Sequence, residues 1–328
     1  MIDFTRRALL AAGAALALAG STVAATAQDK VALRFSAVFS EQDIRAEMMK
    51  KFAEQIGEEF DYQGYYGGTL FKQGTELVAL QRGNLEMGNI APQDISNQIP
   101  AWSVLTSAYL FRDANHLRTF FASEPGQEMK QMVEDQLGVK VLGPTYFGAR
   151  QVGLRVDKKI NTPADMAGIK LRMPGGDAWQ FLGQALGANP TPMAYAEVYT
   201  GLQTGAIDGQ DNPLPNVQNM KFYEVMSQIV MTSHLVGYDL LTISLDAWNK
   251  LSPEQQEKVQ AAADAAIEWS TDEHLKREEE LASFFKEQGL EIYTPDLEAF
   301  RSNAQKMYLE SELAKDWPEG MVDRINAL

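Results

Sequence analysis

The most informative part of the chain reads Gly168-Ile-Lys-Leu-Arg-Met-Pro-Gly-Gly-Asp-Ala-Trp179 and continues to Gly205-Ala-Ile-Asp-Gly-Gln-Asp-Asn-Pro213. Apolar residues at 169, 171 and 173 alternate as in a strand, which places Arg172 on the opposite face. The run Pro174-Gly-Gly176 then breaks the strand, and Asp177 is expected to cap a helix that reaches about residue 185. A second helix is predicted over 194–204, ending at Gly205.

Arg172 is a candidate binding residue. A guanidinium at a strand end offers two parallel N–H donors, and the neighbouring helix N-terminus adds backbone N–H groups, so a carboxylate would be held well there. The alternative is that Arg172 pairs with one of the many surface carboxylates, and the residues alone leave both interpretations open. Arg150 is a second cation at a predicted strand junction. Two arginines near one cleft would be costly to desolvate without an anion.

The first 27 residues have the features of a secretory signal peptide. Arg6 and Arg7 precede an apolar run over 8–19, and Ala25-Thr-Ala27 is a small-x-small cleavage site, so Gln28 is the expected new N-terminus. The run Thr5-Arg-Arg-Ala-Leu-Leu10 also resembles a twin-arginine export signal, with the Sec route as the alternative. We therefore expect an exported, periplasmic protein.

Composition narrows the classes of partner. The 328 residues carry a formal net charge of −15, which makes nucleic acid and anionic lipid poor partners. An anionic ligand would need a local cluster of positive charge. The chain has no cysteine, so disulfides and thiolate metal sites are excluded. Its length suits two domains with a substantial core.

Strand-like apolar runs alternate with helical segments, which predicts an α/β fold with mostly parallel sheets. The expected strands cover residues 31–36, 60–66, 85–90, 139–146, 151–156 and 240–245. One short pattern occurs twice, at Leu80–Gly88 and at Leu202–Gln210, where a helix ends at Gly83 or Gly205 before a strand. This repeat indicates two similar lobes that share a cleft, and clefts between domains are favoured ligand sites.

A long helix is predicted near the C-terminus. Ser252-Pro-Glu254 is a typical helix start, with Ser as N-cap, and Gly289 is the expected end. At 1.5 Å per residue such a helix is about 55 Å long, more than one lobe needs, so it should brace both. No low-complexity linker separates the lobes, and we expect the chain to cross between them several times.

The sequence gives little support for catalysis, a cofactor or a metal. His274 lies among charged residues on a polar helix face and is expected to be solvated, whereas His116 and His234 have only a small chance of a functional role. No zinc spacing, nucleophile elbow, P-loop or dinucleotide fingerprint occurs. Asp208 and Asp211 could be paired carboxylates, but no acid partner or nucleophile accompanies them.

A series of motifs occurs in a fixed order: Phe147-Gly-Ala-Arg-Gln151, Asn161-Thr-Pro-Ala-Asp-Met-Ala-Gly168, Ile169-Lys-Leu-Arg-Met-Pro174, Ala188-Asn-Pro-Thr-Pro-Met193, Glu197-Val-Tyr199, Gly201-Leu-Gln-Thr-Gly205 and Ile207-Asp-Gly-Gln-Asp-Asn-Pro213. Together they resemble the extracytoplasmic solute-binding proteins of TRAP transporters, the DctP-like family, over essentially all of the exported chain. The resemblance implies a two-lobed periplasmic binding protein fold, with a cleft between the lobes and a long helix spanning both. The expected lobes are 28–147 with 236–275, and 148–235 with 276–328.

The same resemblance implies a set of ligand-binding residues. Arg172 would form the main salt bridge to a ligand carboxylate, with Arg150 as the second arginine and Asn212 as a hydrogen-bonding partner. The remaining expected pocket residues are Tyr195, Asp239, Tyr238, Gln93 and Trp179. Ala91 stands where sialic-acid-binding members place a glutamate, which argues against sialate as the ligand.

The implied function is capture of a small organic acid, with a sugar acid favoured, and its delivery to a membrane permease. C4-dicarboxylates, 2-oxo acids and aromatic acids stay open as ligands, and a monomer is the default expectation. The alternatives are a periplasmic sensor subunit that presents the ligand to a membrane kinase, and an exported enzyme acting on an acidic substrate.

Overall fold

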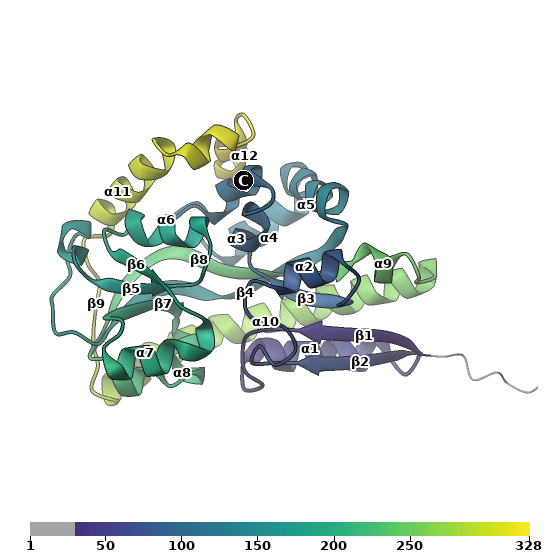
Figure 1. Ribbon diagram of the computed structural model, residues 1–328, viewed down its shortest axis with the longest axis horizontal. Helices are drawn as coiled ribbons and strands as arrows, with labels where there is room; N and C mark the ends of the chain where they lie inside the picture. Colours follow the sequence, from purple (N-terminus) through teal and green to yellow (C-terminus); the bar gives the residue numbers. More distant parts are fainter. Residues whose placement is uncertain (1–29) are drawn as a thin grey trace, which may run out of the picture.

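Two long antiparallel strands run side by side through the centre of the computed structural model, which describes residues 30–328 (Figure 1). They are β4 (Val139–Leu154) and β8 (Gln228–Ser244). Both are much longer than the usual five or six residues of a strand. Sequence analysis expects separate strands at 139–146 and 151–156 and a strand only at 240–245. The structure joins the first two into one and extends the third back to residue 228, because pairing between β4 and β8 continues through register shifts at irregular positions.

All strands belong to one nine-stranded sheet with the order β2-β1-β3-β8-β4-β7-β5-β6, while β9 pairs with β8. Strands pair in parallel at both ends of the sheet, as the sequence pattern predicts, but β3, β8, β4 and β7 pair antiparallel in the centre. The other strands are β1 (Val31–Ser36), β2 (Phe60–Tyr65), β3 (Met87–Ile90), β5 (Lys170–Met173), β6 (Asn189–Pro192), β7 (Gly209–Pro213) and β9 (Glu291–Tyr293).

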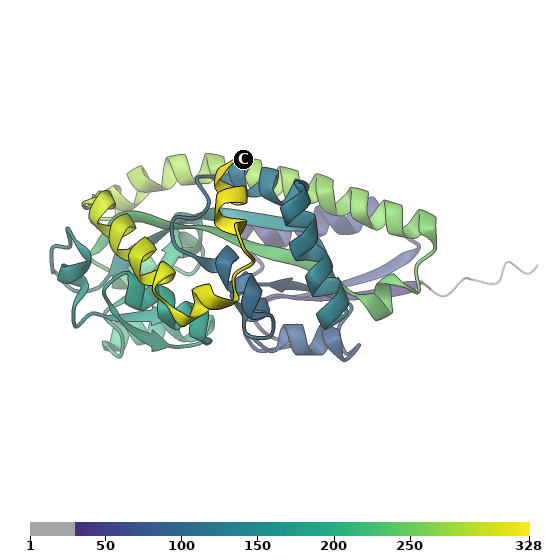
Figure 2. The same cartoon turned by 90° about the horizontal axis from the view of Figure 1, so that it is seen from above.

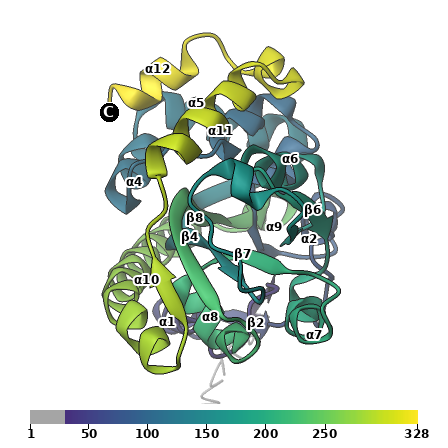
Figure 3. The same cartoon turned by 90° about the vertical axis from the view of Figure 1, so that its left-hand side faces the viewer.

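Helices cover both faces of this sheet (Figure 3). The α-helices are α1 (Ile44–Ile56), α2 (Glu76–Gln81), α3 (Pro92–Ser96), α4 (Ala114–Ala122), α5 (Glu124–Leu137), α6 (Asp177–Ala185), α7 (Val198–Thr204), α8 (Leu214–Asn219), α9 (Leu245–Trp248), α10 (Pro253–Glu287), α11 (Leu297–Leu309) and α12 (Met321–Asn326). Short 3-10 helices are η1 (Pro100–Thr106), η2 (Pro163–Met166), η3 (Tyr195–Glu197), η4 (Phe222–Val225) and η5 (Glu312–Asp316). Within residues 30–328 none of the helices has the length and apolar character needed to cross a bilayer.

The 35-residue helix α10 confirms the predicted long helix and runs along most of the molecule (Figure 2). Ser252 caps it, with its hydroxyl accepting from the Gln255 N–H and the Gln255 side chain accepting from the Ser252 N–H. Gly289, in the left-handed region at φ 91°, lies just past its end. Its first half packs Val259 and Ala263 in one core cluster and its second half packs Phe285 in another, so the helix contacts both lobes.

The strand β8 connects four hydrophobic clusters. Because neighbouring residues on a strand point to opposite faces, Leu240 packs with α4 and α5 while Leu241 packs with α1 and α10. Nearer the start of the strand, Val230 packs in a cluster with residues of α6 and α11. Its neighbour Ile229 packs on the other face, in a cluster with residues of α7 and α8. Both lobes are therefore built on one continuous strand.

Some local expectations are corrected by the structure. Gly176, not Asp177, is the N-cap of α6, and Asp177 is its first residue. The predicted second helix begins as the short 3-10 helix η3 and ends at Gly205 in the left-handed conformation, as expected. Helix α12, which the sequence assigns with the second lobe, packs Met321 in the cluster that contains α4 and α5 of the first. The signal peptide lies outside the described residues.

The predicted crossing between the lobes lies where β4 and β8 bring two glycines together. Gly148 has φ 119°, a backbone angle that residues with a side chain rarely adopt, and it pairs with Gly237 next to a register shift. A Cβ on Gly237 would lie 2.5 Å from the Gly148 carbonyl oxygen. Glu278 on α10 accepts from the Ala149 N–H at 2.6 Å and from the Tyr146 hydroxyl, which ties the long helix to this crossing.

Replacing Gly237 with Ala is expected to lower the free energy of unfolding by about 1–3 kcal/mol, because the added methyl group overpacks the crossing. Urea unfolding followed by circular dichroism measures this change. Gly175→Ala is the matched control, since nothing lies within 4 Å of a Cβ at that position. Equal stability of the two variants would show that the crossing tolerates a side chain.

Candidate functional site

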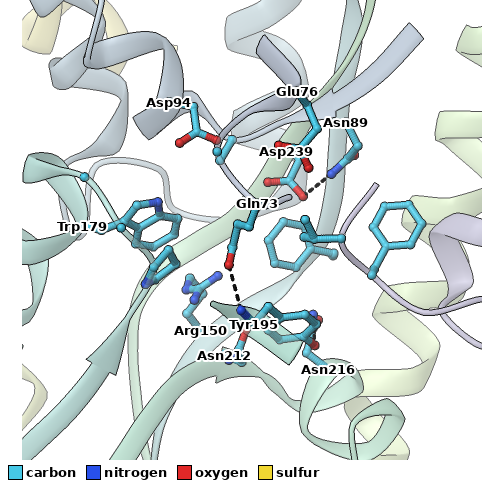
Figure 4. Close-up of a pocket in the computed structure, with 18 of the residues that line it drawn as sticks. Gln73, Glu76, Asn89, Asp94, Arg150, Trp179, Tyr195, Asn212, Asn216 and Asp239 are labelled. Atoms are coloured by element: carbon cyan, nitrogen blue, oxygen red, sulfur yellow. Dashed lines mark hydrogen bonds between the residues drawn. The ribbon is translucent and has the colours of Figure 1, made fainter. Parts of the chain in front are cut away.

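A cavity of about 310 Å³ lies between the two lobes, close to β5, β7 and the middle of β8 (Figure 4). One wall comes from the lobe that contains α2, β3 and α3, and the other from β5, α6, β7 and α8. Of the predicted ligand-binding residues, Arg150, Arg172, Trp179, Tyr195, Asn212 and Asp239 line this cavity. Residues far apart in the chain are thus brought to one site.

Arg172 is buried, with 1% of its surface exposed. Its Nε donates to the Met193 carbonyl oxygen at 2.8 Å and one Nη donates to Gln73 Oε1 at 3.2 Å, but no carboxylate among residues 30–328 forms an ion pair with it. Burial, together with the neighbouring positive charge of Arg150, lowers the pKa of Arg172 to about 9. The surface ion pair that sequence analysis left open for Arg172 does not form.

Arg150 differs because it has a partner inside the protein. Its Nε donates to Asp211 Oδ1 at 2.6 Å, one Nη donates to the Asp211 backbone oxygen, and the guanidinium lies 4.8 Å from the Trp179 ring centre. The His234 Nε2 atom lies 3.3 Å from Asp211 Oδ1, and all three side chains are buried. Burial alone would raise the pKa of Asp211, but Arg150 and His234 lower it to about 2. Asp211 is a fixed anion that orients Arg150.

Polar side chains lie beside the two arginines. The Asn212 amide uses one of its two hydrogens to donate to Gln210 Oε1 at 2.6 Å, which leaves the other for a ligand. The Tyr195 hydroxyl accepts from the Asn216 Nδ2 at 3.1 Å, and its ring centre lies 5.8 Å from the Arg172 guanidinium carbon. Burial raises the pKa of Tyr195 to about 12, so the phenol stays neutral.

Asp239 lies on the opposite wall. It accepts from an Arg45 Nη at 2.8 Å and from the Asn89 amide at 2.6 Å. Arg45 is in turn paired with Asp43 and lies 4.3 Å from the ring centres of both Phe39 and Phe147. This network fixes the Asp239 carboxylate at the cavity surface.

Two predicted site residues lie elsewhere. Tyr238 precedes Asp239 on β8, and because neighbouring strand residues point to opposite faces its ring packs against Phe111 and Phe121, with the hydroxyl donating to the Leu105 carbonyl oxygen. Gln93 lies on α3 and is buried behind the cavity surface, whereas Asp94 next to it lines the cavity. Neither Tyr238 nor Gln93 belongs to the lining.

The histidines have structural positions. His274 is expected to be solvated, and this prediction is wrong: its side chain points from α10 into the protein and is 1% exposed, and its Nδ1–H donates to the Ser270 carbonyl oxygen at 2.7 Å. Burial lowers the pKa of His274 to about 4. The charged sequence neighbours of His274 do not reveal its burial, because successive residues of a helix point in different directions around the helix axis. Within residues 30–328 no three acidic or histidine side chains are placed to hold a metal ion.

Several lining residues escape sequence reasoning: Arg45, Gln73, Glu76, Asn89, Asp94 and Asn216. Three of them, Arg45, Glu76 and Asp94, lie on helices of the first lobe. Gln73 lies in the loop before α2, Asn89 on β3 and Asn216 on α8. The sequence carries no signal for them: Glu76, for example, is a charged residue whose burial at the start of α2 is visible only in the structure. These residues line the cavity because the two lobes face each other across the cleft, and a local sequence pattern does not predict that arrangement.

Residues 35–315 match the DctP family, described as bacterial extracellular solute-binding protein, family 7, so the chain belongs to that family. This class of protein binds solutes and is not enzymatic. The expected two-lobed α/β fold is confirmed by solved structures of the same class.

Among individual relatives, a TRAP periplasmic solute-binding protein from Roseobacter denitrificans, crystallised with 3-deoxy-D-manno-oct-2-ulosonic acid (KDO), is 48% identical; the match covers 91% of this chain and 99% of that one, with a TM-score of 0.90. A second structure from the same organism, with bound β-D-glucuronate, is 28% identical over 90% of this chain and 99% of that one, with a TM-score of 0.82. The sialic acid-binding periplasmic protein of Vibrio cholerae is 37% identical over 65% of each chain.

Replacing Asp211 with Asn is expected to destabilise the fold by about 3–5 kcal/mol at neutral pH, because Arg150 would stay buried without its charged partner. The folded-state pKa of Asp211, about 2, is below its ordinary value of 3.8. The stabilisation by Asp211 is therefore complete above that ordinary value and is lost as the pH falls towards about 2. Urea unfolding of wild type and variant at several pH values measures the difference, which should shrink over this range. A difference that does not change with pH would contradict the assignment.

Proposed function

We propose that this chain captures a sugar acid in the periplasm through a salt bridge between Arg172 and the ligand carboxylate. It then delivers the acid to the membrane subunits of a TRAP transporter. Membership of the solute-binding family supports the transport role. The ligand class and the salt bridge are inferred from the site.

The observation that carries the proposal is the buried charge of Arg172 without an anionic partner. Removing a guanidinium from water costs several kcal/mol unless an opposite charge accompanies it, and the lowered pKa of Arg172 reflects that cost. A ligand carboxylate would supply the missing charge. Within the described chain the Nη1 groups of Arg150 and Arg172 have no hydrogen-bond acceptor, so both are available to it.

Relatives support a sugar acid over the other acids. The KDO-bound protein from Roseobacter denitrificans and the glucuronate-bound one both hold sugar acids. The cavity also fits such a ligand, because amide and carboxylate groups line it along with the arginines and can hydrogen-bond to hydroxyls. KDO is the first ligand to test.

Binding would work by closure of the two lobes. The strands β4 and β8 and the helix α10 pass between the lobes, and the Gly148–Gly237 crossing is a suitable place for a hinge. A ligand that contacts both walls binds the closed form better and shifts the population towards it. The closed form would then be the one presented to the permease.

Thermal unfolding of the purified protein with KDO, D-glucuronate, a C4-dicarboxylate and an aromatic acid tests the proposal. A ligand at a hundredfold excess over its dissociation constant should stabilise the chain by about 2.7 kcal/mol. We expect Arg172→Ala to weaken binding of the stabilising acid roughly 100-fold or more, since truncating one partner of a buried charge pair costs about 2–5 kcal/mol.

Arg155→Ala is the matched control, because Arg155 is partly exposed and outside the cavity. Near-normal affinity in Arg172→Ala would overturn the site assignment. If no acid shifts the unfolding curve, mass spectrometry of the denatured protein decides between a co-purified ligand and a cavity that binds no acid.

A further inference from the structure

Three carboxylates gather on one wall of the cavity: Glu76 from the start of α2, Asp94 from α3 and Asp239 from β8. Figure 4 shows them on the side away from Arg150 and Asn212. Arg172 lies at the same end of the cavity as Arg150, because among the charged groups Arg150 has the largest effect on the pKa of Arg172. The cavity is therefore positive at one end and rich in carboxylates at the other.

Two of these carboxylates have no cation to neutralise them. Asp239 is paired with Arg45, but Glu76 and Asp94 form no ion pair with any residue in 30–328. The Asp94 carboxylate also accepts no hydrogen bond from the described part of the chain. Burial raises the pKa of Glu76 to about 8 and that of Asp94 to about 7, and in each case a neighbouring carboxylate raises it further.

A separate feature of the same cavity indicates that its ligand carries hydrogen-bond donors. Asn216, on the other wall, is 4% exposed, and its Oδ1 has no hydrogen-bond partner within residues 30–328. A buried amide oxygen without a donor is costly, so this position lacks a hydrogen-bond donor that a ligand would bring. The Asn216 Oδ1 atom and the Asp94 carboxylate both lack hydrogen-bond donors that a ligand could supply.

We propose that Glu76 and Asp94 form a distal subsite that accepts the hydroxyl-bearing end of a monocarboxylate sugar acid and excludes dicarboxylates. This inference rests on the proposed function and narrows its ligand class. The hydroxyls of a sugar acid donate to the carboxylates, while its one carboxylate lies at the arginines. Above pH 8, where Glu76 and Asp94 are ionised, a second carboxylate would face like charges in a desolvated site, and like-charge contacts in an interface cost several kcal/mol.

This subsite decides between two ligand classes that the arginines alone cannot separate. Both a sugar acid and a C4-dicarboxylate satisfy Arg172. Only the first has neutral donors for the opposite wall, so specificity comes from repulsion at the far end as well as from attraction at the near one.

The test uses two pairs of probes that differ only in a terminal CH₂OH or carboxylate: KDO with its C8-oxidised diacid, and D-galactonate with galactarate. Titration calorimetry at pH 8.5, above the pKa of both Glu76 and Asp94, measures the affinity of each acid, and the ratio of the two affinities is taken for the pair whose monocarboxylate binds more tightly. We expect wild type to prefer the monocarboxylate by about 100-fold, and Glu76→Gln and Asp94→Asn each to reduce this preference about tenfold or more.

Glu59→Gln is the control, because Glu59 is exposed and distant from the cavity. Both cavity variants should unfold at or above the wild-type temperature, since each removes a buried, unpaired carboxylate. A ratio near one in wild type, or a ratio that neither cavity variant changes, overturns the subsite. If no acid binds, or if binding survives Arg172→Ala, the proposed function itself fails.

Discussion

The rest of the site depends on one buried positive charge, that of Arg172. The fold holds it with the Met193 carbonyl oxygen and the Gln73 amide, which orient the guanidinium but do not neutralise it. A buried charge without a partner lowers the free energy of unfolding, and burial of apolar side chains in the rest of the core offsets that loss. Under the proposed function this cost has a counterpart, because a guanidinium that is already buried and oriented can bind a ligand carboxylate without rearrangement.

The surrounding ionic groups divide into those with partners and those without. Arg150 has Asp211, and Asp239 has Arg45, and these pairs fix their side chains in one geometry. Arg172, Glu76 and Asp94 have no ion-pair partner among residues 30–328, although they line the same cavity as Arg150 and Asp239. In a chain whose net charge is −15, the positive end of the cavity is produced locally and is shielded by burial from the repulsive field of the whole molecule.

Continuity of the backbone between the lobes gives the cleft its geometry. β4, β8 and α10 join the two walls of the cleft by continuous backbone, and the close contact between Gly148 and Gly237 lies beside an irregularity in β4–β8 pairing. The β8 strand also carries side chains into all four core clusters. The exact residue boundaries of the lobes stay a prediction.

The sequence by itself determined the α/β class, the long capped helix, the left-handed glycine stops and the ordered motifs around Arg172, because these follow from short-range periodicity and capping chemistry. Its prediction that Arg150, Arg172, Tyr195 and Asn212 share one site agrees with the cavity lining. Only the tertiary structure decided that Asp239 and not Tyr238 faces the cavity, that His274 is buried, and that Glu76 and Asp94 stand opposite the arginines. Those facts depend on strand facing, on the angle of a helix to its core and on contact across a cleft, and no local pattern of residues encodes them.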